Sequence, residues 1–185
     1  MKISKIIWAI RAVLYKVRYG KIGSMSYIGK PLFTTGEKSC FIGSKVRIYP
    51  GMRLEITEGI GKLIIEDDTS IGQNFHVAVA ENDVRIGAHT TISGNVHITS
   101  LDHGYKMMGT HILKQPLISR ETSIGENCFI GYGVVILAGT KLGKQCVVGA
   151  NSVVRGSFPD GCVLAGVPAR IIKRYNEQTG CWEDE

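Results

Sequence analysis

The sequence predicts a mainly β fold in which hexapeptide repeats wind into a parallel β-helix, three repeats to each coil. Two observations predict it: an aliphatic residue recurs every six positions, and glycine and other small residues recur at fixed places between them. A six-residue period fits neither a helix nor an uninterrupted strand, whereas it fits a short strand followed by a turn. One repeat cannot bury its aliphatic side chain alone, so the repeats must stack as coils.

The repeat is most regular over residues 118–154, and it extends in broken phase from residue 42 onwards. Its regular aliphatic positions are Ile118, Ile124, Ile130, Ile136, Leu142, Val148 and Val154. We therefore expect coils over residues 40–156, followed by a C-terminal extension over residues 157–185, all within a single domain of 185 residues.

A coil of three hexads makes definite pairs of residues. It stacks Cys128 on Cys146, and we expect two free, buried thiols there rather than a disulfide. The aliphatic pairs expected between coils are Ile124 with Leu142, Ile130 with Val148, and Ile136 with both Ile118 and Val154.

Positive charge is concentrated at the N-terminus. The chain has 22 Lys and Arg against 16 Asp and Glu, but residues 1–21 hold six of the basic residues and no acid. The remainder is formally neutral, which argues against nucleic acid as a partner. Residues 1–21 also carry aliphatic side chains at helical spacing, which predicts an amphipathic basic helix. Two interpretations stay open: the helix packs against its own domain, or it contacts a membrane surface.

Other features restrict the compartment. Residues 1–21 contain no apolar run long enough to span a membrane, and Lys5 and Arg11 interrupt the segment. The five cysteines form no CxxC pair and are odd in number, which favours a reducing compartment. We expect a cytoplasmic protein, peripheral at the inner face of the cell membrane if the helix contacts lipid.

One break in the repeat predicts a functional loop. The step from Ile98 to Ile118 is 20 residues where one hexad takes six, so one repeat carries an insertion of 14 residues over 104–117. Loops on rigid scaffolds often carry function. His103 stands immediately before the insertion, and an imidazole with a pKa near 6.5 is suited to removing a proton from an attacking hydroxyl. His111 lies within the loop and is the reserve candidate, whereas His76, His89 and His97 are expected to be solvated or packed.

The hexads, the Asp-His-Gly-Tyr sequence at 102–105 and the Ala-Gly-Val-Pro-Ala-Arg string at 165–170 resemble the hexapeptide-repeat acyltransferases, and most closely the bacterial surface-polysaccharide and sugar O-acetyltransferases. The resemblance implies a left-handed β-helix and a homotrimer that uses acetyl-CoA as co-substrate without a metal. It implies direct acetyl transfer to a hydroxyl of a capsule or O-antigen sugar.

The same resemblance assigns roles to residues. It makes His103 the general base and, more weakly, places Asn74 and Asp102 on the acceptor side. Neighbours on an extended chain point to opposite faces, so a direct pair of Asp102 with His103 is not expected. The residues implied in cofactor binding are Gly131, Tyr132 and Ala150 beside the pantetheine arm, and Arg170 and Lys173 at the phosphates.

Three alternative functions remain. Relatives with this fold also N-acetylate nucleotide amino sugars, and the sequence does not separate an amine acceptor from a hydroxyl. A zinc lyase of the γ carbonic anhydrase kind needs three converging histidines, whereas His97 and His103 are one hexad apart and so lie on different faces. A scaffold without activity would not need the loop histidine or the cations that follow the coils.

Overall fold

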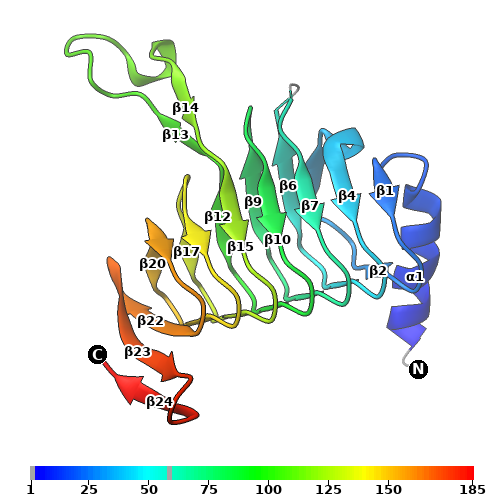
Figure 1. Cartoon of the computed structure of the whole chain (residues 1–185). Helices are drawn as coiled ribbons and strands as arrows, with labels where there is room; N and C mark the ends of the chain where they lie inside the picture. The colour runs from blue at the N-terminus through cyan, green and yellow to red at the C-terminus, as the bar shows by residue number, and fades with distance from the viewer. Residues whose placement is uncertain (1–2, 58–59) are drawn as a thin grey trace.

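The computed structural model describes residues 3–57 and 60–185, and it shows a parallel β-helix that confirms the predicted fold class. An N-terminal helix closes one end of the stack, an arm leaves the stack between β12 and β15, and a short antiparallel extension closes the other end (Figure 1). The chain passes in turn through three parallel sheets, which form the three sides of each coil.

We call these sides sheets A, B and C. Sheet A contains β1 (Lys21–Ile22), β4 (Cys40–Ile42), β7 (Leu63–Ile65), β10 (Val84–Ile86), β15 (Thr122–Ile124), β18 (Lys141–Leu142) and β21 (Ser157–Phe158). The parallel strands of sheet B are β2 (Tyr27–Ile28), β5 (Arg47–Ile48), β8 (Ser70–Ile71), β11 (Thr91–Ile92), β16 (Phe129–Ile130), β19 (Val147–Val148) and β22 (Cys162–Gly166). Sheet C contains β3 (Phe33–Thr35), β6 (Arg53–Ile56), β9 (His76–Val79), β12 (His97–Thr99), β17 (Val135–Ile136) and β20 (Val153–Val154).

The aliphatic position of each repeat points into the core, as predicted. In the regular part, Ile124 pairs with Leu142, Ile130 with Val148 and Ile136 with Val154. These side chains are buried and form a continuous column of apolar layers inside the coils. Cys128 and Cys146 directly precede the aligned residues Phe129 and Val147, and both are buried free thiols, which confirms that prediction.

Coil length varies in the first half of the β-helix. The successive partners Ile28, Ile48, Ile71 and Ile92 are unequally spaced, and none of the three steps is a whole number of hexads. The predicted start of the coils at residue 40 is wrong as well, because the first coil begins at β1. The 3-10 helix η1 (Glu37–Ser39) lies between Thr34 and Ile42 and lengthens that coil, so the six-residue spacing of Ile22, Ile28 and Thr34 does not continue in phase into β4.

The predicted end of the coils at residue 156 is also too early. β21 and β22 continue sheets A and B in parallel register, although the step from Val147 to Val163 is slightly shorter than three hexads. Only β23 (Ala169–Asn176) and β24 (Cys181–Asp184) form the extension, and both run antiparallel to their neighbours.

The insertion forms a two-stranded arm. β13 (Leu101–His103) pairs antiparallel with β14 (Leu117–Ser119), and the loop between them contains the 3-10 helix η2 (Ile112–Lys114). The predicted pairing of Ile118 with Ile136 is wrong. Ile118 lies opposite Asp102 in the arm, and Ile136 pairs instead with Ile98. Hexad spacing alone cannot distinguish a strand of the stem from a strand of the next coil.

Helix α1 (Ile3–Tyr15) covers the first coil. Ala12 is buried, and the Trp8 ring packs between Tyr27 and Tyr49 at centroid distances of 5.8 and 5.5 Å. The guanidinium of Arg11 donates to the carbonyl oxygen of Ile28 over 3.1 Å. The helix therefore packs against its own domain, but through its aromatic face and not through its aliphatic stripe. No helix in the described residues is long and apolar enough to cross a membrane.

Candidate active site

The arm positions His103 away from the coils. The N–H of Gly104 donates to the carbonyl oxygen of Pro116 over 3.0 Å, and this bond continues the β13–β14 stem. Within the loop, the buried amide of Gln115 donates to the carbonyl oxygens of Met107 and Thr110 and accepts from the Met107 N–H. His103 thus stands exposed on a strand whose loop is held by internal hydrogen bonds, so its imidazole is accessible to a substrate.

Asp102 is directed elsewhere. Its carboxylate lies 3.9 Å from the guanidinium of Arg120, the residue that follows the arm. The Arg120 N–H in turn donates to the carbonyl oxygen of Ser100 over 2.8 Å, so this pair closes the base of the arm. The contact agrees with the expectation that neighbouring residues of a strand point apart. Asp102 braces the arm that carries His103.

The outer face of sheet C carries a polar cluster next to the arm. Arg53, His76 and His97 are register partners on successive coils, and the two imidazole rings lie 4.4 Å apart between centroids. His76 Nε2 lies 3.2 Å from Glu55 Oε1, and Glu55 also forms an ion pair with Arg53. We call these four residues the sheet C cluster.

His97 is a half-buried member of the sheet C cluster. Burial, and next the neighbouring His76, lower the pKa of His97, so this ring is neutral at neutral pH. Its buried Nδ1 has no hydrogen-bond partner among the described residues. A buried ring nitrogen without a partner is costly to the stability of the fold. Sequence reasoning missed this pair because the step from His76 to His97 is not a whole number of hexads.

Asn74 occupies the corner between sheets B and C, with a left-handed φ of 56°. Its side-chain amide donates to Asn95 Oδ1 over 3.0 Å, and the Asn95 amide donates to the Tyr132 hydroxyl. The left-handed conformation is one that asparagine tolerates better than most residues. Asn74 therefore joins the same corner as the predicted cofactor residue Tyr132.

Gly131 and Ala150 lie on this corner too. A Cβ at Gly131 would stand 2.7 Å from both the carbonyl oxygen of Val148 and the N–H of Ala150, so only glycine fits. The Asn151 N–H donates to the carbonyl oxygen of Tyr132 over 2.8 Å, which keeps successive corners in close contact. The corner is a column of closely packed backbone in which Tyr132 and Ala150 are exposed.

The two predicted phosphate ligands lie on β23, beyond the last coil. Arg170 pairs with Ala165 of β22, near the point where the column of B–C corners ends after the last coil. Within the described residues its guanidinium donates to the carbonyl oxygen of Ala169. Lys173 instead forms an ion pair with Asp184 at 2.7 Å. Arg170 is thus the more available cation of the two.

The arm and the corner column lie at opposite ends of the strands of sheet C. Each coil runs from sheet B through the B–C corner into sheet C, and the arm leaves where β12 ends, towards sheet A. Within one chain, the outer face of sheet C therefore separates His103 from Gly131, Tyr132 and Ala150. The sheet C cluster lies on that face.

The remaining histidines have local partners. His111 Nδ1 accepts from the N–H of Leu113 over 3.2 Å and caps η2, and His89 lies 3.2 Å from Asp68 at a corner of sheets A and B. Among the residues that the structure describes, no three His, Cys, Asp or Glu side chains gather as a metal site would require.

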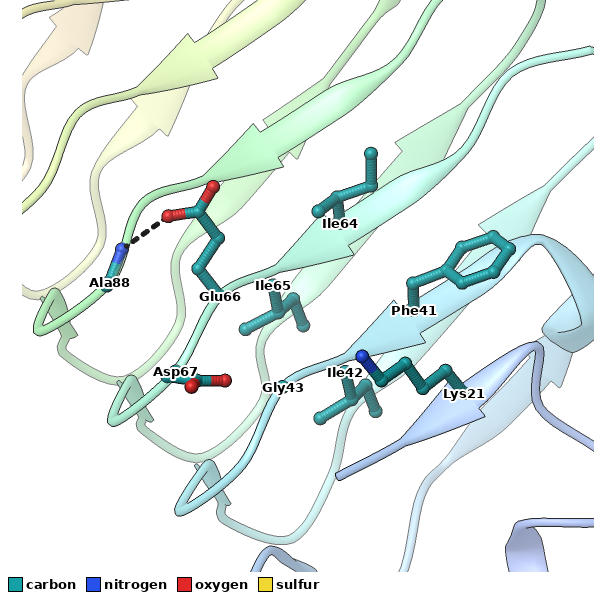
Figure 2. A pocket seen from close by; sticks show the side chains of 9 residues that line it. All are labelled: Lys21, Phe41, Ile42, Gly43, Ile64, Ile65, Glu66, Asp67 and Ala88. Carbon is teal, nitrogen blue, oxygen red and sulfur yellow. Dashed lines mark hydrogen bonds between the residues drawn. The ribbon is translucent and has the colours of Figure 1, made fainter. Parts of the chain in front are cut away.

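A shallow depression of about 360 Å³ lies elsewhere, on the outer side of sheet A (Figure 2). Its carboxylates brace the coils: Glu66 accepts from the Ala88 N–H over 3.1 Å, and Asp67 accepts from the Ser44 N–H over 2.7 Å. Neither the arm nor the B–C corner contributes to it, so we do not assign it to the active site.

The fold defines a class, the β-helix proteins built of hexapeptide repeats. Residues 121–156 match the family model of the bacterial transferase hexapeptide, six repeats. Over 160 residues the chain is 38% identical to WbbJ of Escherichia coli K12, covering 83% of this chain and 81% of WbbJ, whose name assigns it to lipopolysaccharide biosynthesis as an O-acetyl transferase. The chain belongs to the hexapeptide-repeat transferase family, and it is an acyltransferase.

Two solved structures share the fold. AntD, an N-acyltransferase from Bacillus cereus in complex with dTDP and 3-hydroxybutyryl-CoA, has a TM-score of 0.78 at 20% identity, and the match covers 91% of this chain and 90% of AntD. Galactoside acetyltransferase in complex with coenzyme A has a TM-score of 0.65 at 24% identity, and the match covers 96% of this chain and 75% of that one.

Proposed function

We propose that this acyltransferase transfers an acetyl group from acetyl-CoA to a sugar hydroxyl in the biosynthesis of a capsule or O-antigen polysaccharide. The exposed imidazole of His103 on the stem of the arm is the observation that carries the proposal. The similarity to WbbJ supports a surface polysaccharide as the destination, and the coenzyme A complex of galactoside acetyltransferase supports the co-substrate.

The reaction is a direct transfer. The acceptor oxygen attacks the thioester carbonyl carbon while His103 removes the hydroxyl proton, and the C–S bond then breaks to release coenzyme A, which takes up a proton as its thiol. No acyl-enzyme and no metal are needed. Backbone N–H groups stabilise the oxyanion. Arg170 and Lys173 hold the phosphates of coenzyme A, while Gly131, Tyr132 and Ala150 line its pantetheine arm.

The acceptor lies over the outer face of sheet C. Arg53 and Glu55 bring both signs of charge to this face, and the rings of His76 and His97 lie beside them. Asn74 lies at the B–C corner, where its amide donates to Asn95 and the Asn95 amide donates to Tyr132, so we assign it a supporting role at the corner.

The site is shared between subunits of a homotrimer. Sheet C separates the arm from the corner column of its own chain, whereas a neighbouring chain related by a threefold axis along the stack can bring its own corner to the arm. Each site would then contain His103 of one subunit and the corner column of the next.

Replacement of His103 by Gln tests the general base. We expect turnover to fall about 10²–10⁴-fold with acetyl-CoA binding unchanged, because only proton removal is lost. His111→Gln in the same arm is the matched control and should keep near wild-type turnover. A His103→Gln enzyme that folds, binds acetyl-CoA and turns over at the wild-type rate would refute the role.

The alternative acceptor is the amine of a nucleotide amino sugar. AntD, an N-acyltransferase, has this fold, but a likeness at 20% identity concerns the fold alone. A panel of acceptors, each supplied with a hydroxyl and with an amine at the same carbon, separates the two. Faster transfer to the hydroxyl members is the expected result, and turnover of the amines alone would replace O-transfer with N-transfer.

A further inference from the structure

The aliphatic face of α1, continued by the turn after it, is exposed. Ile3, Ile7, Ile10, Val13, Leu14 and Val17 are each between 51% and 77% exposed, and we call them the α1 stripe. With 3.6 residues per turn, Leu14 lies about 200° around the axis from the buried Ala12. The stripe therefore points away from the coils, at the free end of the stack where α1 lies (Figure 1).

The stripe is not an unfinished contact with the protein's own core. The opposite face of α1 already holds the helix in place through Trp8 and Ala12, and two arginines add polar contacts. Arg11 donates to the carbonyl oxygen of Ile28, and Arg18 forms an ion pair of 2.6 Å with Glu37. Turning the stripe inward would break all of these contacts.

The end of the molecule that carries the stripe is strongly positive. Residues 1–39, which include α1 and the first coil, hold eight Lys and Arg and only one acid, Glu37. The rest of the chain holds 14 basic and 15 acidic residues. A second copy of this end would repel the first, whereas an anionic surface would attract it. A large aliphatic stripe at a positively charged end of the molecule is the combination that inserts into the interface of an anionic bilayer.

We propose that α1 docks this protein on the surface of an anionic phospholipid bilayer. The α1 stripe enters the boundary between headgroups and acyl chains, while the exposed Lys16 and the positive first coil face the phosphates. The docking does not depend on which acceptor the enzyme acetylates. It places the stack end-on to the membrane, with the arm above the surface.

Sedimentation of the full-length protein with lipid vesicles tests the proposal. We expect binding to vesicles of phosphatidylglycerol and phosphatidylethanolamine, and none to phosphatidylcholine alone. Ile7→Ser with Leu14→Ser should weaken binding by more than about tenfold through loss of apolar burial. Lys16→Glu should weaken binding because it replaces a positive charge with a negative one. Raising the salt from about 0.1 to about 0.5 M should weaken binding by screening the charges. Ile60→Ser, an equally apolar and exposed site away from α1, is the matched control.

The outcomes distinguish a lipid surface from a second copy of this chain as the partner of the α1 stripe. Circular dichroism and light scattering on each variant establish that fold and assembly are kept. Failure of the wild-type protein to bind anionic vesicles, or equal binding by the Ile7 and Leu14 double variant, overturns the proposal. So does a double variant that dissociates into smaller oligomers, because the stripe would then be a contact between copies of this chain.

Discussion

Burial and charge act together on His97. The ring lies against His76 on the outer face of sheet C, and both desolvation and the second imidazole disfavour a proton on it. Neutrality keeps the ring able to accept as well as donate a hydrogen bond, which suits it to a sugar hydroxyl. His103 on the arm is exposed and has no such neighbour, so the two histidines are suited to different tasks: binding and proton transfer.

The depressed pKa of His97 predicts a loss of stability in mild acid. The unfolded chain binds a proton at this histidine below about pH 6.5, whereas the folded chain resists it, so unfolding is favoured as the pH falls from about 6.5 towards the folded-state pKa. Denaturant unfolding at successive pH values should show this slope in the wild type and a smaller one in His97→Gln. Identical slopes would mean that His97 is protonated equally in both states.

The cysteines predict a simple accessibility pattern. Cys40, Cys128, Cys146 and Cys162 are buried, and Cys181 is exposed. The hydrogen bond between Cys128 and Cys146 raises the pKa of the Cys128 thiol and lowers that of Cys146 to about 7, but both thiols are buried, so access rather than pKa limits their reaction. A thiol reagent should therefore modify only Cys181 quickly in the native protein, and all five after denaturation. Cys181→Ser should remove the fast phase, and a fast phase that survives it would show that the coils open.

Among the elements, the regular hexads could be predicted residue by residue and the irregular ones could not. From β15 to β20 every coil is three full hexads, so spacing alone fixes register. The first coil keeps hexad spacing at Ile22, Ile28 and Thr34 but is out of phase with the next coil because η1 lies between them. The arm strand β14 imitated a hexad because Ile118 happens to stand one hexad before Ile124. The predicted cofactor residues Gly131, Tyr132 and Ala150 share a corner because coil periodicity aligns them, whereas Arg170 and Lys173 lie beyond the last coil on β23. The sheet C cluster stayed hidden because it spans coils whose lengths are not multiples of six.

The two proposed phosphate ligands on β23 give a prediction about the KM for acetyl-CoA. Arg170→Ala with Lys173→Ala should raise the KM for acetyl-CoA at least about tenfold and leave the KM for the acceptor unchanged, because charged hydrogen bonds to phosphate are lost. Asp184→Asn should lower that KM, since it releases Lys173 from its ion pair. Arg174→Ala, on the same strand but paired with Glu185, is the control. An unchanged KM in the double variant would remove both cations from the cofactor site.

At the scale of the whole molecule, a site shared between subunits predicts the mass of the assembly and the activity of mixtures of variant chains. Light scattering should give three times the 20.2 kDa of the chain. A refolded equal mixture of His103→Gln chains and Arg170→Ala, Lys173→Ala chains should recover up to about a quarter of wild-type sites at low acetyl-CoA, because some neighbours then supply both intact halves. No recovery from the mixture, or full activity in a monomer, would place the whole site within one chain.

The stack of coils has one further consequence, which concerns height. With α1 lying on the membrane, each coil raises the chain by one strand spacing of about 4.8 Å. The arm leaves after β12, three coils above β3 of the first coil. The number of coils before the arm would thus act as a ruler that holds the transfer chemistry roughly 15 Å above the first coil, with α1 between that coil and the lipid. An acceptor sugar tethered to a lipid would be acetylated only where its chain reaches that level, so a chain with one coil removed would select a different residue of the growing glycan.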